Sequence, residues 1–158
     1  MDEKSMEQFS IVEKTEQAAK EHFRHGLNCA ECVVQGFLDT HDTGMPQEVL
    51  ALTTGFGGGI GRTKNLCGAI SGAVMALGLV KGRRNPLAKE TAAERIGELG
   101  EIYPFYTEMV QELEAHYGTL ICRELCAPHG EFEGKARRKN CQEMVAFCAA
   151  LAAKYAEK

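Results

Sequence analysis

The chain has 158 residues, of which 44% are apolar and 25% are charged, and its net charge is -4. This length can bury the core of one domain, and the slightly acidic balance argues against a nucleic-acid partner. Residues 1–20 carry no secretion signal and no apolar run is long enough to span a bilayer, so we expect a cytoplasmic protein without a membrane partner.

Apolar residues at helical spacing predict an all-α fold, a single-domain helical bundle of about six or seven helices over residues 1–158. Asn28 is the expected N-cap of one helix, and Pro46 is the expected first residue of the next. No segment alternates at a period of two residues, so we expect no sheet. The expected helices lie at about 5–25, 29–40, 46–54, 67–80 and 88–117, shortly after Thr119, and at 136–156.

The longest of these predicted helices, over 88–117, carries an apolar face that runs from Ile96 through Tyr103 to Tyr117. We expect this face to lie inward. Pro104 stands inside the helix and should kink or split it, because proline lacks the N–H group that a helix interior needs.

A glycine-rich loop over residues 55–61 has five glycines in seven positions. Glycine permits positive φ angles and close approach of the backbone. The loop matches neither common nucleotide-binding pattern, which gives nucleotide binding little support. In the helix that follows, Gly68, Gly72 and Ala76 are spaced four apart, and we interpret this stripe as a surface for helix packing.

Seven cysteines are many for a chain without an export signal. A reducing compartment disfavours a disulfide scaffold, and an odd number cannot all pair within one chain. The thiols therefore serve as metal ligands, as redox groups or as small buried apolar residues.

Four of the cysteines lie one to three positions after an asparagine or threonine, residue types that are common at helix N-caps. Three of these thiols are expected in the first turn of a helix, where the positive end of the helix dipole favours the reactive thiolate, and Cys141 is the exception because its helix is expected to start near Lys135. We expect Cys67, which follows the glycine loop, to be the most reactive thiol. The pairs are Asn28 and Cys29, Asn65 and Cys67, Thr119 and Cys122, and Asn140 and Cys141.

The other cysteines are Cys32, Cys126 and Cys148, which follow at helical intervals and are interpreted as core residues. No second C-x-x-C pair is present, so a two-pair zinc site is not expected. The histidines show no metal-binding spacing. The basic segment over 135–139 is interpreted as a solvated start of a helix.

Four sequence elements occur in order and together resemble the redox-active proteins labelled C_GCAxxG_C_C, over about residues 25–150. The resemblance implies that Cys29, Cys67, Cys122 and Cys141 form the functional set and that the other three cysteines are additional. The chain is also similar to the non-haem part of the split-Soret cytochromes, which carry an iron–sulfur cluster, although it lacks a haem-attachment motif. The elements are Asn28-Cys29-Ala30-Glu31, then Gly57-Gly58-Gly59 leading to Cys67-Gly68-Ala69-Ile70-Ser71-Gly72, then Cys122-Arg123-Glu124-Leu125, and finally Cys141.

Three functions remain open after this step. The first is a redox protein in which the four cysteines are both the catalytic thiols and the ligands of an iron–sulfur cluster or other metal, with Gly57, Gly58, Gly59 and Gly68 against that cofactor. The second is a metal-free thiol–disulfide oxidoreductase or redox sensor. The third is a non-catalytic helical interaction module. The sequence leaves open whether the protein is an oxidoreductase or an electron-transfer protein, which redox partner it has and whether it forms a homodimer.

Overall fold

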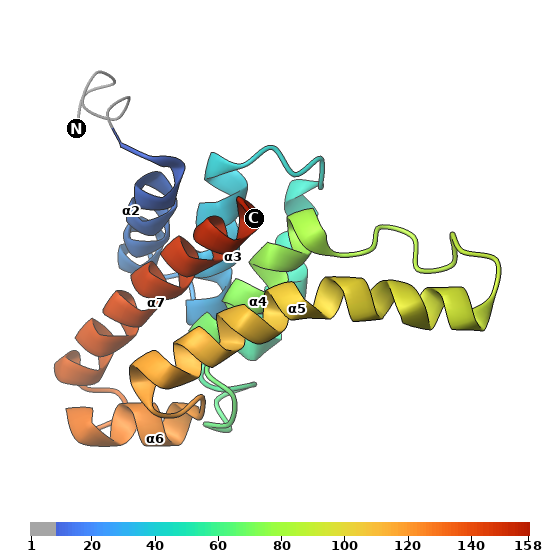
Figure 1. Ribbon diagram of the computed structural model, residues 1–158. Helices are drawn as coiled ribbons and strands as arrows, with labels where there is room; N and C mark the ends of the chain where they lie inside the picture. The colour runs from blue at the N-terminus through green and yellow to red at the C-terminus, as the bar shows by residue number, and fades with distance from the viewer. Residues whose placement is uncertain (1–8) are drawn as a thin grey trace.

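The computed structural model describes residues 9–158, and these residues form an all-helical fold (Figure 1). Within this range the only β feature is one isolated antiparallel bridge, between Leu66 and Ile121. The predicted all-α class is therefore confirmed. The α-helices are α2 (Ile11–Arg24), α3 (Cys29–Thr40), α4 (Gly68–Lys81), α5 (Ala92–Tyr117), α6 (Cys122–Cys126) and α7 (Lys135–Ala156), and the 3₁₀ helices are η1 (Gln47–Phe56) and η2 (Ala127–His129).

Most predicted helix positions agree with the structure within a few residues. The helix predicted over 46–54 is present as the 3₁₀ helix η1 rather than as an α-helix. The predicted start of the first helix at residue 5 lies outside the described residues. None of the helices in residues 9–158 is both long and apolar enough to cross a membrane.

The start of α3 is fixed by the predicted N-cap Asn28, which forms a capping box with Glu31. The Asn28 side chain accepts a hydrogen bond from the Glu31 N–H group, and the Glu31 carboxylate accepts one from the Asn28 N–H group, each at 2.9 Å. This reciprocal pair satisfies two N–H groups that have no partner within the helix. As a consequence, Cys29 is the first helical residue of α3.

Helix α5 continues through Pro104, so of the two predicted effects of this proline, a kink or a split, the split is wrong. The carbonyl that loses its helical partner is that of Gly100, four residues earlier. Both Gly100 and Pro104 are exposed, so water can hydrogen-bond this carbonyl.

The core lies between α2, α3, α4 and α7, where small residues allow close packing. A Cβ atom on Gly72 of α4 would lie 2.9 Å from the Cβ atom of Val33 in α3. The interpretation of the small-residue stripe as a helix-packing surface is confirmed at Gly72. The largest fully buried side chains include Phe37, Ile70, Leu77 and Val145.

The N-terminal half of α5 projects away from the other helices (Figure 1). The buried residues of this helix, Met109 and Leu113, both belong to its second half. Ile96 is 69% exposed and Tyr103 is 56% exposed. The prediction that the apolar face of α5 lies inward along its whole length is therefore wrong for its first half.

Candidate functional site

The four cysteines that the sequence singles out come together, although they lie far apart in the chain. Cys122 and Cys141 belong to one buried cluster, against which Cys29 packs. The thiols of Cys122 and Cys141 are also near enough to Cys67 for their charges to raise its pKa. We refer to Cys29, Cys67, Cys122 and Cys141, together with Cys126, as the thiol cluster.

Two backbone segments hold Cys67 and Cys122 side by side. The Cys67 N–H group donates to the carbonyl of Leu120 at 2.9 Å, and the Cys122 N–H group donates to the carbonyl of Asn65 at 2.6 Å. These bonds flank the isolated antiparallel bridge. The start of α4 and the start of α6 are thus tied together.

Glycines allow the chain to pass close to two of the thiols. A Cβ atom on Gly68 would lie 2.7 Å from the carbonyl oxygen of Phe56 and 3.2 Å from the Cβ atom of Cys29. A Cβ atom on Gly59 would lie 2.7 Å from the Cβ atom of Cys122. The two distances of 2.7 Å are shorter than real Cβ contacts, so Gly59 of the glycine loop packs directly against Cys122, and Gly68 packs against the Phe56 carbonyl beside Cys29.

The glycine loop continues into a left-handed turn that includes residues other than glycine. Ile60, Arg62 and Lys64 have φ angles of 69°, 64° and 63°, and three glycines between positions 58 and 61 also have positive φ. For residues with a side chain this conformation costs about 1–2 kcal/mol each. Strain of this kind collects at functional sites, where the surrounding structure enforces it. Within residues 9–158, the N–H groups of Gly58 and Gly59 donate no hydrogen bond to another backbone group.

Burial controls the protonation of the thiol cluster. Burial is the main reason that the pKa of Cys67 and that of Cys122 are each raised to about 11. The pKa of Cys141 is raised still further, first by a hydrogen bond with Cys29 and then by burial. In the reduced, metal-free chain these three thiols are therefore protonated at neutral pH.

The prediction that Cys67 is the most reactive thiol is wrong for this state. The N–H groups of Ala69 and Ile70 at the start of α4 do lower its pKa, as a helix N-terminus should. Burial outweighs them, since Cys67 is only 7% exposed. Of the seven cysteines, Cys29 alone is partly exposed.

The three additional cysteines divide into two groups. Cys32 and Cys148 are fully buried in the main core, which confirms their interpretation as core residues. Cys126 instead belongs to the thiol cluster, and its sulfur lies 3.9 Å from that of Cys122. Its interpretation as an ordinary core residue is wrong, because the turn of α6 places it beside Cys122.

Arg137 is a part of the site that the sequence analysis missed. Its guanidinium lies over the ring of Phe132, with 3.8 Å from Cζ to the ring centre. Burial would lower the pKa of Arg137, but a hydrogen bond with Cys126 and the charges of Cys141, Cys126 and Cys29 raise it. The interpretation of the segment over 135–139 as wholly solvated is therefore wrong at this residue.

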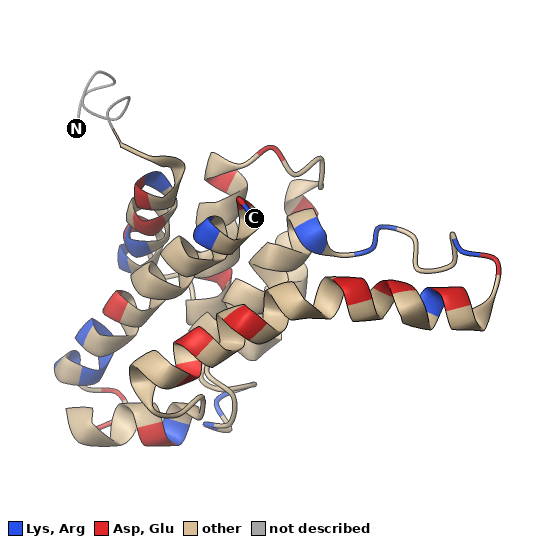
Figure 2. Ribbon diagram, viewed as in Figure 1, with Lys and Arg blue, Asp and Glu red and all other residues tan. Residues whose placement is uncertain are grey.

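The signal that could have identified Arg137 is the charge pattern at the start of α7. The first turn of this helix holds no acidic residue, and basic residues gather there (Figure 2). Cations at the positive end of a helix are unfavourable unless an anionic partner compensates them. Here the thiols of Cys126 and Cys141 lie beside that end.

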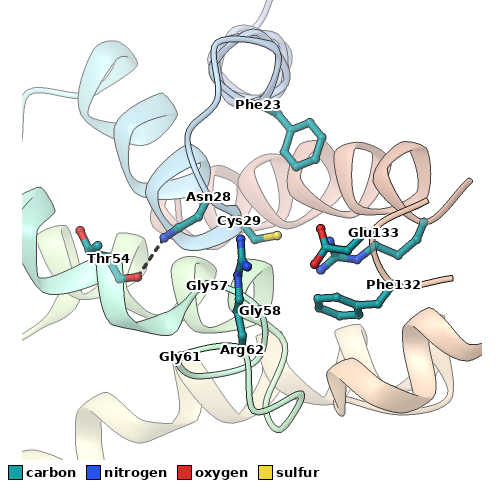
Figure 3. A pocket seen from close by; sticks show the side chains of 11 residues that line it. Phe23, Asn28, Cys29, Thr54, Gly57, Gly58, Gly61, Arg62, Phe132 and Glu133 are labelled. Carbon is teal, nitrogen blue, oxygen red and sulfur yellow. Dashed lines mark hydrogen bonds between the residues drawn. The ribbon is translucent and has the colours of Figure 1, made fainter. Parts of the chain in front are cut away.

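A cavity with a volume of about 450 Å³ adjoins the thiol cluster. The sulfur of Cys29 points into it (Figure 3), so the cavity connects the cluster to the surface. The residues that line it are Phe23, Asn28, Cys29, Thr54, Gly57, Gly58, Gly61, Arg62, Phe132, Glu133 and Arg137.

The predicted site residues thus occupy one region of the molecule. Gly57 and Gly58 line the cavity, and Gly59 and Gly68 contact cysteines. Among residues 9–158, no three side chains of histidine, cysteine, aspartate or glutamate are arranged around a point where one metal ion could bind.

Comparison with known proteins gives one match. The family model described as "Putative redox-active protein (C_GCAxxG_C_C)" matches residues 27–155. This range includes the glycine loop and every member of the thiol cluster. No curated protein and no solved structure matches the chain.

Proposed function

Because the chain belongs to the C_GCAxxG_C_C family of redox-active proteins, we propose that its thiol cluster is a redox centre in which Cys29, Cys67, Cys122 and Cys141 hold an iron–sulfur cluster. The observation that carries this proposal is the convergence of these thiols from four separate segments of the chain. Small buried apolar residues need not gather in this way.

The chemistry of the donors fits this group. The possible metal ligands of the buried cluster are thiols, and soft thiolate ligands select iron–sulfur clusters, zinc or copper(I). Four cysteines are the usual ligand set of an iron–sulfur cluster. A single ion with bonds of about 2.3 Å needs all its sulfurs about 3.8 Å apart. The close thiol contacts here form a row, from Cys29 to Cys141, from Cys141 to Cys126 and from Cys126 to Cys122, and not one set around a single point in the described residues, which suits a group with several metal atoms better.

The surroundings of the thiols favour negative charge. Helices α4 and α7 begin at the thiol cluster, and neither has a side chain that caps its first N–H groups. These helix ends, together with the guanidinium of Arg137, provide positive potential. The N–H groups of Gly58 and Gly59 are donors that the sulfur atoms of a bound cluster could accept.

An iron–sulfur cluster bound there would supply one-electron transfer. The chain's own residues would hold the group and keep water from it, because Cys67, Cys122 and Cys141 are buried. Cys29 lies at the cavity and is the nearest part of the site to the surface. Electrons would therefore enter and leave on the Cys29 side.

Anaerobic purification followed by an absorption spectrum and by iron and sulfide analysis tests this proposal. We expect a coloured protein with bound iron and acid-labile sulfide. Cys67→Ser and Cys141→Ser should lose both, whereas the core variant Cys148→Ala should keep them. A colourless protein without iron, even after reconstitution with iron and sulfide, would overturn the proposal.

The contact of 3.9 Å between the sulfurs of Cys122 and Cys126 favours a second candidate function, thiol–disulfide exchange. In this reaction the two thiols give two protons and two electrons to an external disulfide, which becomes two thiols, and a bond forms between the two sulfurs. Metal-free protein would then lose two free thiols reversibly in oxidised dithiothreitol. Cys126→Ser should prevent that loss and Cys148→Ala should not, and an unchanged thiol count in the wild-type chain would exclude this function.

A further inference from the structure

The cavity beside Cys29 has the size and walls of a small-molecule site. Its volume of about 450 Å³ lies within the usual range of ligand pockets, about 300–1,000 Å³. Two aromatic rings, Phe23 and Phe132, form apolar parts of its wall, and glycine backbone forms another part. The sulfur of Cys29 points toward the space between them (Figure 3).

The charged groups of the cavity are mainly cationic. The guanidinium groups of Arg62 and Arg137 line it, against the single carboxylate of Glu133. A third cation, Lys64, lies with its Nζ atom 4.6 Å from the centre of the Phe132 ring. The cavity therefore carries an excess of positive charge in an acidic protein.

These two arginines have no carboxylate partner among the described residues. Within residues 9–158, neither Arg62 nor Arg137 forms an ion pair with a carboxylate. The Nε atom of Arg137 is buried and has no hydrogen-bond partner in this part of the chain. An unsatisfied buried donor costs about 1–3 kcal/mol.

The position of Arg62 is enforced by strained backbone. Its φ angle is 64°, and a Cβ atom on Gly58 would lie 2.8 Å from the Cγ atom of Arg62. The strained conformation of the loop thus places the Arg62 side chain beside the cavity. Arg62 is exposed, so its side chain lies at the cavity's solvent side.

From these features we infer that the cavity binds a small organic anion, with a carboxylate or phosphate group on Arg62 and Arg137 and an aromatic or other apolar body against Phe23 and Phe132. Guanidinium groups bind such anions through paired, charge-assisted hydrogen bonds. The bound molecule lies against the exposed thiol of Cys29. This position makes the bound anion the substrate or effector of the proposed redox centre. Binding of the anion does not depend on which redox chemistry the thiols perform.

Titration calorimetry with phenyl phosphate on the protein as purified tests this inference, with the iron content recorded for each sample. Phenyl phosphate combines an anionic group and a ring. We expect saturable binding at one site per chain, about tenfold tighter than that of inorganic phosphate or of phenol. Because iron content and anion binding are separate readouts, a protein that binds phenyl phosphate but stays colourless even after reconstitution with iron and sulfide would refute the iron–sulfur proposal alone.

Arg62→Ala and Arg138→Ala form a matched pair of variants. Arg62 lines the cavity, whereas Arg138 is an exposed arginine next to Arg137 that does not line it. Alanine tolerates positive φ no worse than arginine, so Arg62→Ala leaves the loop conformation unchanged. We expect Arg62→Ala to weaken binding about tenfold and Arg138→Ala to leave it unchanged. Equal effects of the two substitutions, or no saturable binding to the wild-type chain, would overturn the inference.

Discussion

Gly59 and Cys122 are in direct contact across the thiol cluster, since a Cβ atom on the glycine would lie 2.7 Å from that of the cysteine. The two residues belong to segments that are far apart in the chain. The same glycine has a φ angle of 71°. Position 59 therefore requires glycine for two independent reasons, its backbone conformation and the space that Cys122 occupies.

Gly59→Ala should therefore destabilise the protein more than Gly61→Ala does. Both positions have positive φ, but a Cβ atom on Gly61 would meet nothing within 4 Å. We expect Gly61→Ala to cost about 1–2 kcal/mol of backbone strain and Gly59→Ala to cost at least about 1 kcal/mol more. Urea unfolding measures both free energies of unfolding. Equal losses of stability in the two variants would show that Cys122 moves aside at no cost.

Gly72 and Gly78 offer a second matched pair, within α4. A Cβ atom on Gly72 would lie 2.9 Å from the Cβ atom of Val33, whereas one on Gly78 would meet only the Tyr106 hydroxyl, at 3.6 Å. Gly72→Ala should lower the free energy of unfolding by about 1–3 kcal/mol, because it forces α3 and α4 apart. Gly78→Ala should raise it by up to about 1 kcal/mol through helix propensity. Thermal or urea unfolding that gives the same sign for both variants would contradict this packing.

Alkylation of the reduced, metal-free chain should distinguish the thiols by exposure. We expect iodoacetamide to modify Cys29 first, because it alone is partly exposed, and Cys67 and Cys148 much later. Since burial raises the pKa of Cys67 to about 11, its modification rate should rise about tenfold per pH unit toward that value. Peptide mass spectrometry after timed quenching follows each site. Modification of Cys67 ahead of Cys29 at neutral pH would contradict the burial of Cys67.

The raised pKa values also predict how stability depends on pH. Burial raises the pKa of Cys67 to about 11 and that of Cys32 to about 12. An unfolded thiol has a pKa of about 8.5, so above that pH the unfolded chain loses protons that the folded chain keeps. The free energy of unfolding should therefore fall between about pH 9 and pH 11, by about 1.4 kcal/mol per pH unit for each such thiol.

Urea unfolding of metal-free, reduced protein across this pH range measures the slope. Cys67→Ala should show a shallower decline than the wild-type chain, because it lacks one of the shifted thiols. Below about pH 8 the buried thiols are protonated in both states and contribute no slope. Identical slopes for the two proteins above pH 9 would show that folding does not raise the pKa of Cys67.

Local signals in the sequence were sufficient to predict the helices and the start of α3, where Cys29 lies. Asn28 as N-cap predicts where α3 begins, and the structure has that cap, to which Glu31 adds the second half of a capping box. These interactions join neighbours in the chain, so they can be recognised from spacing alone. The gathering of Cys29, Cys67, Cys122 and Cys141 was expected from the family resemblance, and not from spacing.

The features that sequence reasoning missed depend on contacts between distant segments. The reactivity assigned to Cys67 considered the start of α4 but not the burial that the rest of the fold imposes. From the sequence alone, Arg137 is one of several basic residues at the start of a helix. Only the fold brings it beside Cys126. Ile60 is a β-branched residue that avoids positive φ, so nothing in its local sequence indicates a left-handed turn.

The projection of α5 implies that this helix has two parts of different local stability. Its second half is anchored by Met109 and Leu113, whereas its first half buries no residue and contains Gly97 and Gly100. An isolated helix of this length is marginal in water, so the first half should open without unfolding of the core. Its amide protons should exchange with solvent far faster than those of the anchored half. A partner that bound the first half of α5 would therefore slow amide exchange in these turns. Exchange in the rest of the molecule would stay unchanged.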